Sequence, residues 1–121
     1  MQSQNNKFFV GRFNEPNDYR GWFIGDFIKE GDVRKTDKFE ILYMENKAGA
    51  IFDSHLHKEK VELLIILEGK AKYKVNDQEV LLEKGSYLYI DAGNVISGEF
   101  LEDSKVFVIH SPSIPTDKIL V

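Results

Sequence analysis

Hydrophobic and polar residues alternate along several short stretches of this chain, with the period of two that is typical of β-strands. The clearest stretch is residues 70–75, where Ala71, Tyr73 and Val75 would face a core and three lysines would face water. Residues 62–68 are almost entirely apolar between their ends, which indicates a strand buried on both faces. The same reasoning predicts further strands at residues 21–28, 39–44, 79–82, 86–90, 95–100 and 105–110.

Turn residues separate these stretches, and none of the stretches has the period of an amphipathic helix. Short strands at this spacing predict an all-β sandwich or barrel. We expect the barrel to cover residues 21–111, with residues 1–20 as an N-terminal arm and residues 21–121 as a single domain. Residues 112–118 contain two prolines and are expected to form a loop with at most one helical turn.

Composition limits the classes of protein that the chain can belong to. It has 121 residues, 42% of them hydrophobic, which suits one domain with a substantial core. The net charge of -4 argues against nucleic acid or an anionic membrane as a partner, and the absence of cysteine excludes disulfides and thiolate metal sites. The first six residues do not resemble a signal peptide, and no apolar run is long enough to span a bilayer. A cytoplasmic protein is therefore expected.

Two of the three histidines, His55 and His57, lie two positions apart in a stretch that otherwise reads as sheet. On one strand their rings would project from the same face, roughly 6.5 Å apart at the backbone, together with Asp53. A chain reversal at residues 58–60 would return Glu62 to that face. Two imidazoles and a carboxylate suit Fe(II), Mn(II), Zn(II) or Ni(II). The simpler interpretation is a pair of surface histidines followed by a solvated charge cluster.

The spacing of these residues resembles the first motif of the cupin superfamily, which is a glycine, five residues, His-x-His, three or four residues, a glutamate, six residues and a glycine. Its fixed positions are matched by Gly49, His55, His57, Glu62 and Gly69. The chain also resembles a small single-domain cupin in length and strand count. This resemblance implies a double-stranded β-helix, or jelly-roll barrel, in which His55, His57 and Glu62 hold a divalent metal.

The second cupin motif is incomplete. Gly85 and Gly93 match it, but Asp91 replaces its proline and Ile96 replaces the histidine that is the family's fourth metal ligand. Three outcomes stay open: a three-ligand site with water in the vacant positions, a substitute ligand, or an organic-ligand pocket without metal. The candidate substitutes are His110 and Asp26; we expect His110 at the rim or surface and Asp26 hydrogen-bonded to backbone or to a residue at the barrel mouth.

Several other side chains are candidates for the pocket wall. On strand parity Ile96 and Phe100 would face the pocket, and tyrosines can combine an apolar body with a polar tip. Asp53 could orient one of the histidines as a hydrogen-bond acceptor. The pocket residues proposed from the sequence are therefore Asp53, Tyr43, Tyr73, Ile96 and Phe100.

Three kinds of function fit this sequence. The first is a metal-dependent enzyme, such as a dioxygenase or isomerase, that acts on a small molecule. The second is a non-catalytic module that binds or senses a sugar-like or carboxylate ligand without metal. The third is an interaction protein that uses the barrel as a scaffold. A homodimer is expected in each case, because Leu63, Ile65 and Leu67 form a second apolar row that needs either the N-terminal arm or another subunit to cover it.

Overall fold

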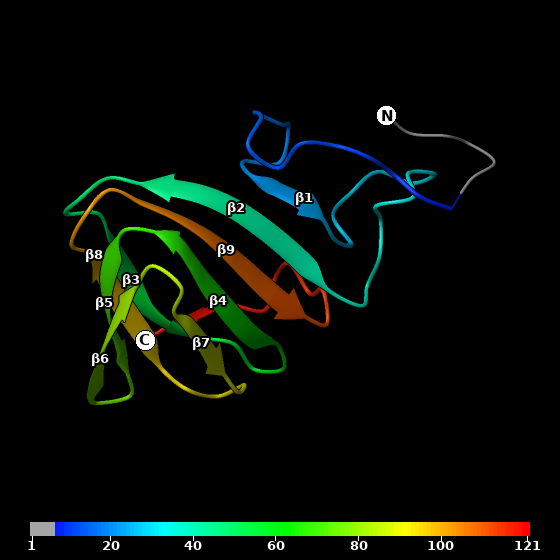
Figure 1. Cartoon of the computed structure of the whole chain (residues 1–121). Helices are drawn as coiled ribbons and strands as arrows, with labels where there is room; N and C mark the ends of the chain where they lie inside the picture. The colour runs from blue at the N-terminus through cyan, green and yellow to red at the C-terminus, as the bar shows by residue number, and fades with distance from the viewer. Residues whose placement is uncertain (1–6) are drawn as a thin grey trace.

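The computed structural model describes residues 7–121, which form two antiparallel five-stranded sheets packed face to face (Figure 1). The first sheet has the spatial order β1 (Trp22–Ile24), β2 (Glu40–Asn46), β9 (Ser104–Ser111), β4 (Val61–Glu68) and β7 (Tyr87–Ile90). The second has the order β10 (Ile119–Leu120), β3 (Ile51–Leu56), β8 (Ile96–Phe100), β5 (Lys70–Val75) and β6 (Gln78–Glu83). The described residues contain no helix, so the predicted all-β jelly-roll fold is confirmed.

Most strands lie where the alternation predicts them, and two differences have local causes. The strand expected at residues 21–28 ends at Ile24, because the chain turns there: the Gly25 N–H donates to the Arg34 carbonyl and the Ile28 N–H donates to the Gly25 carbonyl. The sequence does not predict β10, which adds to the edge of β3 beside His55. Figure 1 shows β1 and its neighbouring loops beyond β2, at the edge of the first sheet.

The core lies between the two sheets and follows the predicted alternation. Ala71 and Tyr73 of β5 are 0% and 2% exposed, and they pack with Leu64 and Ile66 of β4 and with Phe100 of β8. Burial of a leucine, isoleucine or phenylalanine side chain of this core contributes about 1.5–3 kcal/mol relative to an exposed one. The apolar side chains fill one part of the barrel, and the inward positions at the ends of β2, β4 and β9 carry polar residues instead.

The second apolar row on β4 faces outward, as expected. Leu63, Ile65 and Leu67 are half-buried, and the neighbouring β7 presents Tyr87 and Tyr89 at 72% and 56% exposure. Farther along the same face Phe13 of the N-terminal segment packs edge-on against two aromatic rings, with centroid distances of 4.9 Å to both Tyr43 and Phe107. The described part of the arm therefore covers the β2 and β9 side of this face.

Register places three ionisable side chains in one row across the first sheet. His110 of β9 pairs with Glu40 of β2 on one side and with Glu62 of β4 on the other. All three are buried and face the interior of the barrel.

No helix within residues 7–121 has the length and apolar character needed to cross a membrane.

Candidate metal centre

His55, His57 and Glu62 converge inside the barrel. His55 lies near the end of β3, His57 follows that strand, and Glu62 begins the inward row of β4 after the turn at residues 58–60. The three side chains are buried, and one ligand atom from each lies within 4.8 Å of the others. Two imidazoles and a carboxylate at this separation could hold a first-row divalent ion.

A β-bulge in β3 determines which residues share the face of the histidines. Phe52 pairs with Gly98 and His55 pairs with Ile96, so three steps along β3 correspond to two steps along β8. The extra residue reverses the parity of the strand. Phe52 therefore shares the inner face with His55, and their rings lie 5.8 Å apart. The expectation that Asp53 shares this face was wrong, because the bulge turns its side chain to the opposite face of the strand, where it is exposed.

Hydrogen bonds determine how the two imidazoles are oriented. Nδ1 of His55 donates to the backbone carbonyl of Asp53 at 2.8 Å, and Nδ1 of His57 donates to the backbone carbonyl of Asp117. A carbonyl only accepts, so each neutral ring carries its proton on Nδ1 and presents a lone pair at Nε2. Asp53 thus orients His55, but with its backbone and not with its carboxylate.

The surroundings of the His57 Nε2 atom suit a site with a bound cation better than a site without one. It is buried, and it has no hydrogen-bond partner among the described residues. Oε1 of Glu62 lies 3.3 Å away. A lone pair on His57 then faces a carboxylate oxygen, which is a repulsive arrangement unless a positive charge lies between them. The donor set therefore suits a divalent metal.

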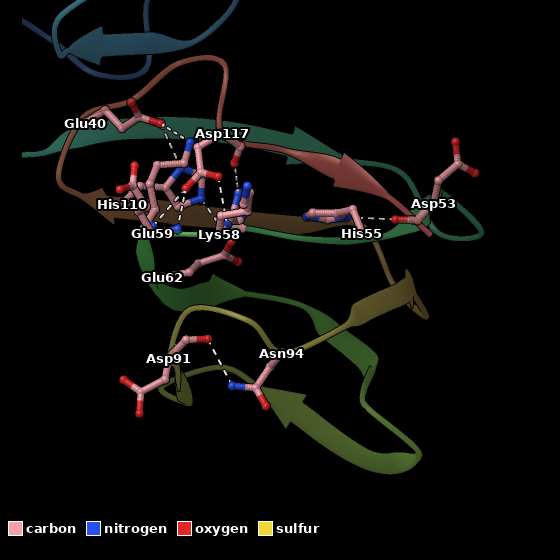
Figure 2. A network of polar contacts seen from close by, with 12 residues as sticks. Glu40, Asp53, His55, Lys58, Glu59, Glu62, Asp91, Asn94, His110 and Asp117 are labelled. Atoms are coloured by element: carbon pink, nitrogen blue, oxygen red, sulfur yellow. Dashed lines mark hydrogen bonds and ion pairs between the residues drawn. The ribbon is translucent and has the colours of Figure 1, made fainter.

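The third histidine is part of a buried chain of charges, so the expectation that His110 lies at the rim or surface was wrong. It is 6% exposed, with Nε2 2.9 Å from Oε1 of Glu62 and Nδ1 2.8 Å from Oε2 of Glu40. Glu40 also accepts from Lys60 Nζ at 2.9 Å and from Ser113 Oγ at 2.8 Å. Figure 2 shows His110 between the two carboxylates.

The hydrogen bonds among these buried charged side chains outweigh the cost of removing their charges from water. Burial alone would raise the pKa of Glu62, but the hydrogen bond from His110, together with the nearby His57 imidazole, outweighs it and the pKa is lowered to about 2. Burial likewise opposes ionisation of Glu40, and the hydrogen bonds from His110, Lys60 and Ser113 lower its pKa to about 2. Burial lowers the pKa of His110, but the two carboxylates raise it overall. Lys60, Glu40, His110 and Glu62 thus alternate in charge.

Asp117 fastens the C-terminal segment to the turn between His57 and Glu62. Its carboxylate accepts the backbone N–H groups of Lys58, Glu59 and Lys60 at 2.8, 2.8 and 2.9 Å (Figure 2). Burial alone would raise the pKa of Asp117, but these backbone hydrogen bonds lower it. Because the carbonyl of the same residue also binds His57, Asp117 positions both the turn and one imidazole.

The histidines and Glu62 open onto a cavity of about 590 Å³. Tyr73, Ile96 and Phe100 line it, as the sequence predicts. Ile96 pairs in register with His55 and is 2% exposed, so an alkyl side chain stands beside the histidines where the cupin motif has a histidine. Tyr43 is not among the lining residues: Leu42 and Met44 occupy the inward positions of β2, and the Tyr43 hydroxyl donates to Glu45 at 2.9 Å.

Asp26 lies outside this cavity. Its side chain is 47% exposed and its Oδ1 lies 3.5 Å from Nζ of Lys35. The backbone N–H of Asp26 donates to Ser113 Oγ at 2.9 Å. Its side-chain partner is therefore a lysine, where the sequence suggested backbone or a residue at the barrel mouth. Neither candidate substitute occupies the position that Ile96 leaves without a ligand.

Sequence reasoning missed Glu40, Lys60 and Asp117. Glu40 had a detectable signal, because it holds an inward position in the alternation that continues through Leu42 and Met44. Lys60 and Asp117 had none, since each lies in a polar loop segment whose partners are distant in the chain.

Together these features define a double-stranded β-helix protein with a candidate metal centre inside its barrel. The chain belongs to the cupin domain family, whose family model matches residues 42–109, more than half of its length.

Individual relatives agree with this family over part of the chain. A quercetin 2,3-dioxygenase from Bacillus subtilis (strain 168) is 35% identical over 57 residues, which are 47% of this chain and 17% of that enzyme. An uncharacterised Klebsiella pneumoniae protein with a double-stranded β-helix domain superposes with a TM-score of 0.65 and 17% identity, over 71% of this chain and 76% of that one. Oxalate decarboxylase from Bacillus subtilis superposes with a TM-score of 0.63 and 19% identity, over 71% of this chain and 24% of that chain.

Proposed function

We propose that this protein binds a divalent metal ion, Fe(II), Mn(II), Zn(II) or Ni(II), through His55, His57 and Glu62 and acts on a small molecule in the adjoining cavity. The observation that carries the proposal is the buried Nε2 of His57, which lacks a hydrogen-bond partner in residues 7–121 and faces Glu62 Oε1 at 3.3 Å. A cation between these atoms converts a repulsive contact into two coordination bonds.

The residues around the three ligands support this assignment. The backbone carbonyls of Asp53 and Asp117 hold the two imidazoles with Nε2 free, and His110 holds the carboxylate of Glu62. Such outer hydrogen bonds fix the tautomer and raise the affinity of metal ligands. The side of the cluster next to Ile96 has no protein ligand, which leaves room for water or an organic ligand.

A bound ion would supply Lewis-acid character to a ligand in the cavity. The relatives named as a quercetin dioxygenase and an oxalate decarboxylase support small-molecule chemistry of this kind. This chain spans only 17% and 24% of those two proteins, so we assign no particular reaction to it.

Metal analysis and calorimetry test the proposal. Protein purified without an affinity tag should contain a stoichiometric first-row metal, and chelator-treated protein should bind Zn(II) and Mn(II) in calorimetric titrations. His55→Ala should abolish this binding. Asp53→Asn is the matched control, because the backbone carbonyl of Asp53, and not its carboxylate, contacts His55. Equal metal binding by the wild type and His55→Ala would overturn the assignment.

A second candidate function is a non-catalytic binding or sensing module that works without metal. It is favoured by Ile96 at the missing ligand position and by the alternating charges of Lys60, Glu40, His110 and Glu62, which balance without a cation. In that case the purified protein contains no metal, and His57→Ala leaves small-molecule binding unchanged.

We also propose a cytoplasmic homodimer. The support for the dimer is the outer face of β4 and β7, where the half-buried Leu63, Ile65 and Leu67 adjoin the exposed Tyr87 and Tyr89. The described arm residue Phe13 contacts Tyr43 and Phe107 on the other half of this face. Sedimentation analysis should find a dimer at micromolar concentration, and Tyr87→Lys should produce monomer. A monomeric wild type would contradict both this assembly and a role of the protein as a dimerising scaffold.

A further inference from the structure

One wall of the cavity is a continuous row of rings that leads inward. Tyr19 contacts Phe27 with a centroid distance of 5.4 Å, Phe27 contacts Trp22 at 6.0 Å, and Trp22 contacts His110 at 5.4 Å. All four residues line the cavity. Tyr19 lies beside the exposed residues at the mouth, and His110 belongs to the buried charge chain. The row therefore gives the cavity a largely aromatic wall between its mouth and the residues next to the candidate metal centre.

The opposite wall is also aromatic. Phe52 contacts Tyr73 with a centroid distance of 4.9 Å and His55 at 5.8 Å, and Tyr73 contacts Phe100 at 6.4 Å. These residues line the same cavity as the first row. Walls of this kind favour a ligand with a flat, apolar body.

Few polar groups inside the cavity are free to bind a ligand. Glu40, Glu62, Lys60 and His110 satisfy one another. Within the described part of the chain, Nδ2 of Asn46 and Nε2 of His57 are fully buried without a partner, and Nε2 of His55 and the Tyr73 hydroxyl form no hydrogen bond with protein. A sugar needs many hydrogen-bonding partners, so this interior fits a ligand with few polar groups.

The mouth of the cavity carries two cations, Arg20 and Lys118, and one exposed carboxylate, Asp18. Neither cation forms an ion pair with a carboxylate of residues 7–121. The carboxylates deeper in the cavity already accept several hydrogen bonds each. Two unpaired cations above an apolar chamber favour the entry of an anion.

Hydrogen bonds hold the backbone at or next to each of these two cations. Oδ1 of Asn17 accepts the N–H groups of Tyr19 and Gly21 at 2.7 and 3.2 Å, and this turn holds Arg20 in a left-handed conformation with φ of 56°. Lys118 directly follows Asp117, whose carboxylate is held by the turn at residues 58–60. Their positions are therefore set by the fold, although their side chains are exposed.

We propose that the ligand of this cavity is a small organic carboxylate with a flat apolar body, its carboxylate held at the mouth by Arg20 and Lys118 and its body between the two aromatic walls. This deepens the proposed function, because it names the class of molecule that would reach the metal centre. It rests on the same cavity, but the two cations act whether or not a metal is bound.

Trp22 makes the proposal directly testable, because it is the one tryptophan of the chain and lines the cavity. Its fluorescence is titrated, in chelator-treated protein, with phenylacetate, with the neutral phenylacetamide and with acetate. Phenylacetate should bind about tenfold more tightly than phenylacetamide, since it alone forms charge-assisted hydrogen bonds. Acetate, which lacks the apolar body, should bind more weakly than both.

The double variant with Arg20→Gln and Lys118→Gln should lose the preference for phenylacetate and keep its affinity for phenylacetamide. A matched control is the double variant with Arg12→Gln and Lys84→Gln, two exposed cations outside the cavity lining, which should behave as wild type. Equal affinity of the wild type for acid and amide, or a preference that survives in the Arg20 and Lys118 variant, would overturn the proposal. Failure of both aromatic probes to bind at millimolar concentration would also contradict it.

Metal titration separates this inference from the proposed function. The Arg20 and Lys118 variant should still bind Zn(II), because neither residue belongs to the His55, His57 and Glu62 cluster. If the wild type binds Zn(II) but shows no preference for phenylacetate over phenylacetamide, the result counts against the organic-anion site alone. A wild type that prefers phenylacetate and binds no metal counts against the metal centre alone.

Discussion

His110 Nε2 lies 2.9 Å from Glu62 Oε1, although the two residues are 48 positions apart in the chain. The contact follows from register, because β9 pairs with β4 so that these two residues face each other directly. The same register brings Glu40 to the other side of His110. A candidate metal ligand is thus held by a histidine that is itself held by a second carboxylate.

Removing His110 should destabilise the fold strongly. His110→Ala leaves Glu40 and Glu62 buried without their shared partner, and breaking a buried charge pair in this way costs about 3–5 kcal/mol. Urea unfolding followed by Trp22 fluorescence measures the loss. His110→Gln, which keeps a hydrogen-bonding side chain, should cost less. A loss in His110→Ala no larger than that of an exposed substitution would contradict the buried network.

The Glu40 carboxylate should make stability depend on pH in the acid range. Its pKa in the fold is about 2, below the ordinary 4.5, so the folded state binds this proton less readily than the unfolded state does. Its contribution is fully present above pH 4.5 and is lost as the pH falls toward 2. Glu40→Gln should make the acid side of the stability curve shallower. Glu79→Gln, at an exposed position of β6, should leave the curve unchanged.

The hydrogen bonds between the Asp117 carboxylate and the turn at residues 58–60 should support both the stability of the fold and its affinity for metal. Asp117→Ala removes the acceptor of three backbone N–H groups and should lower the free energy of unfolding by about 1–3 kcal/mol. Because the turn carries His57 and Glu62, Zn(II) affinity should fall about 10- to 100-fold. Asp103→Ala is the control, since Asp103 accepts one N–H, from Ala48, far from the cluster. Equal Zn(II) affinity in both variants would show that Asp117 serves stability only.

Ile96→His should restore the fourth ligand that the cupin motif contains. Ile96 pairs with His55 and faces the cavity, so an imidazole there lies beside the cluster. Zn(II) and Mn(II) should bind more tightly to this variant than to the wild type in calorimetric titrations. Ile96→Asn, which adds a polar side chain of smaller reach, is the comparison. If Ile96→His only destabilises the protein and leaves metal affinity unchanged, position 96 does not supply a fourth ligand to this site.

Two glycines separate the effect of backbone strain from that of crowding. Gly85 and Gly69 have φ of 89° and 96°, and a Cβ on Gly85 would meet nothing within 4 Å. Gly85→Ala should therefore cost only the strain of a left-handed residue, about 1–2 kcal/mol. Gly69→Ala adds a collision with Ser104 Oγ and with the Asp103 carbonyl oxygen at 2.6 Å, and should cost more. Equal losses in thermal unfolding would argue against the close packing of this turn.

The sequence determined those features that depend on local periodicity and spacing. Alternation over residues 70–75 identified the inward residues Ala71 and Tyr73, because successive side chains of a strand point to opposite faces. The spacing of His55, His57 and Glu62 was sufficient to predict that they converge, since a strand, a short turn and the next strand bring them together. The resemblance to the second cupin motif was sufficient to recognise that Ile96 stands where the family has its fourth ligand.

Tertiary structure decided the features that depend on pairing between distant strands. The partners of His110 follow from the register of β2, β9 and β4, which no local pattern of the chain contains. The bulge in β3 reverses strand parity after Phe52 and turns Asp53 outward, and the pairing with β8 makes it visible. Asp117 reaches the turn at residues 58–60 because β10 returns the C-terminal segment to β3. Strand order and register arise from packing of the whole chain, and a histidine at the end of an apolar strand has the same local sequence whether it faces water or two carboxylates.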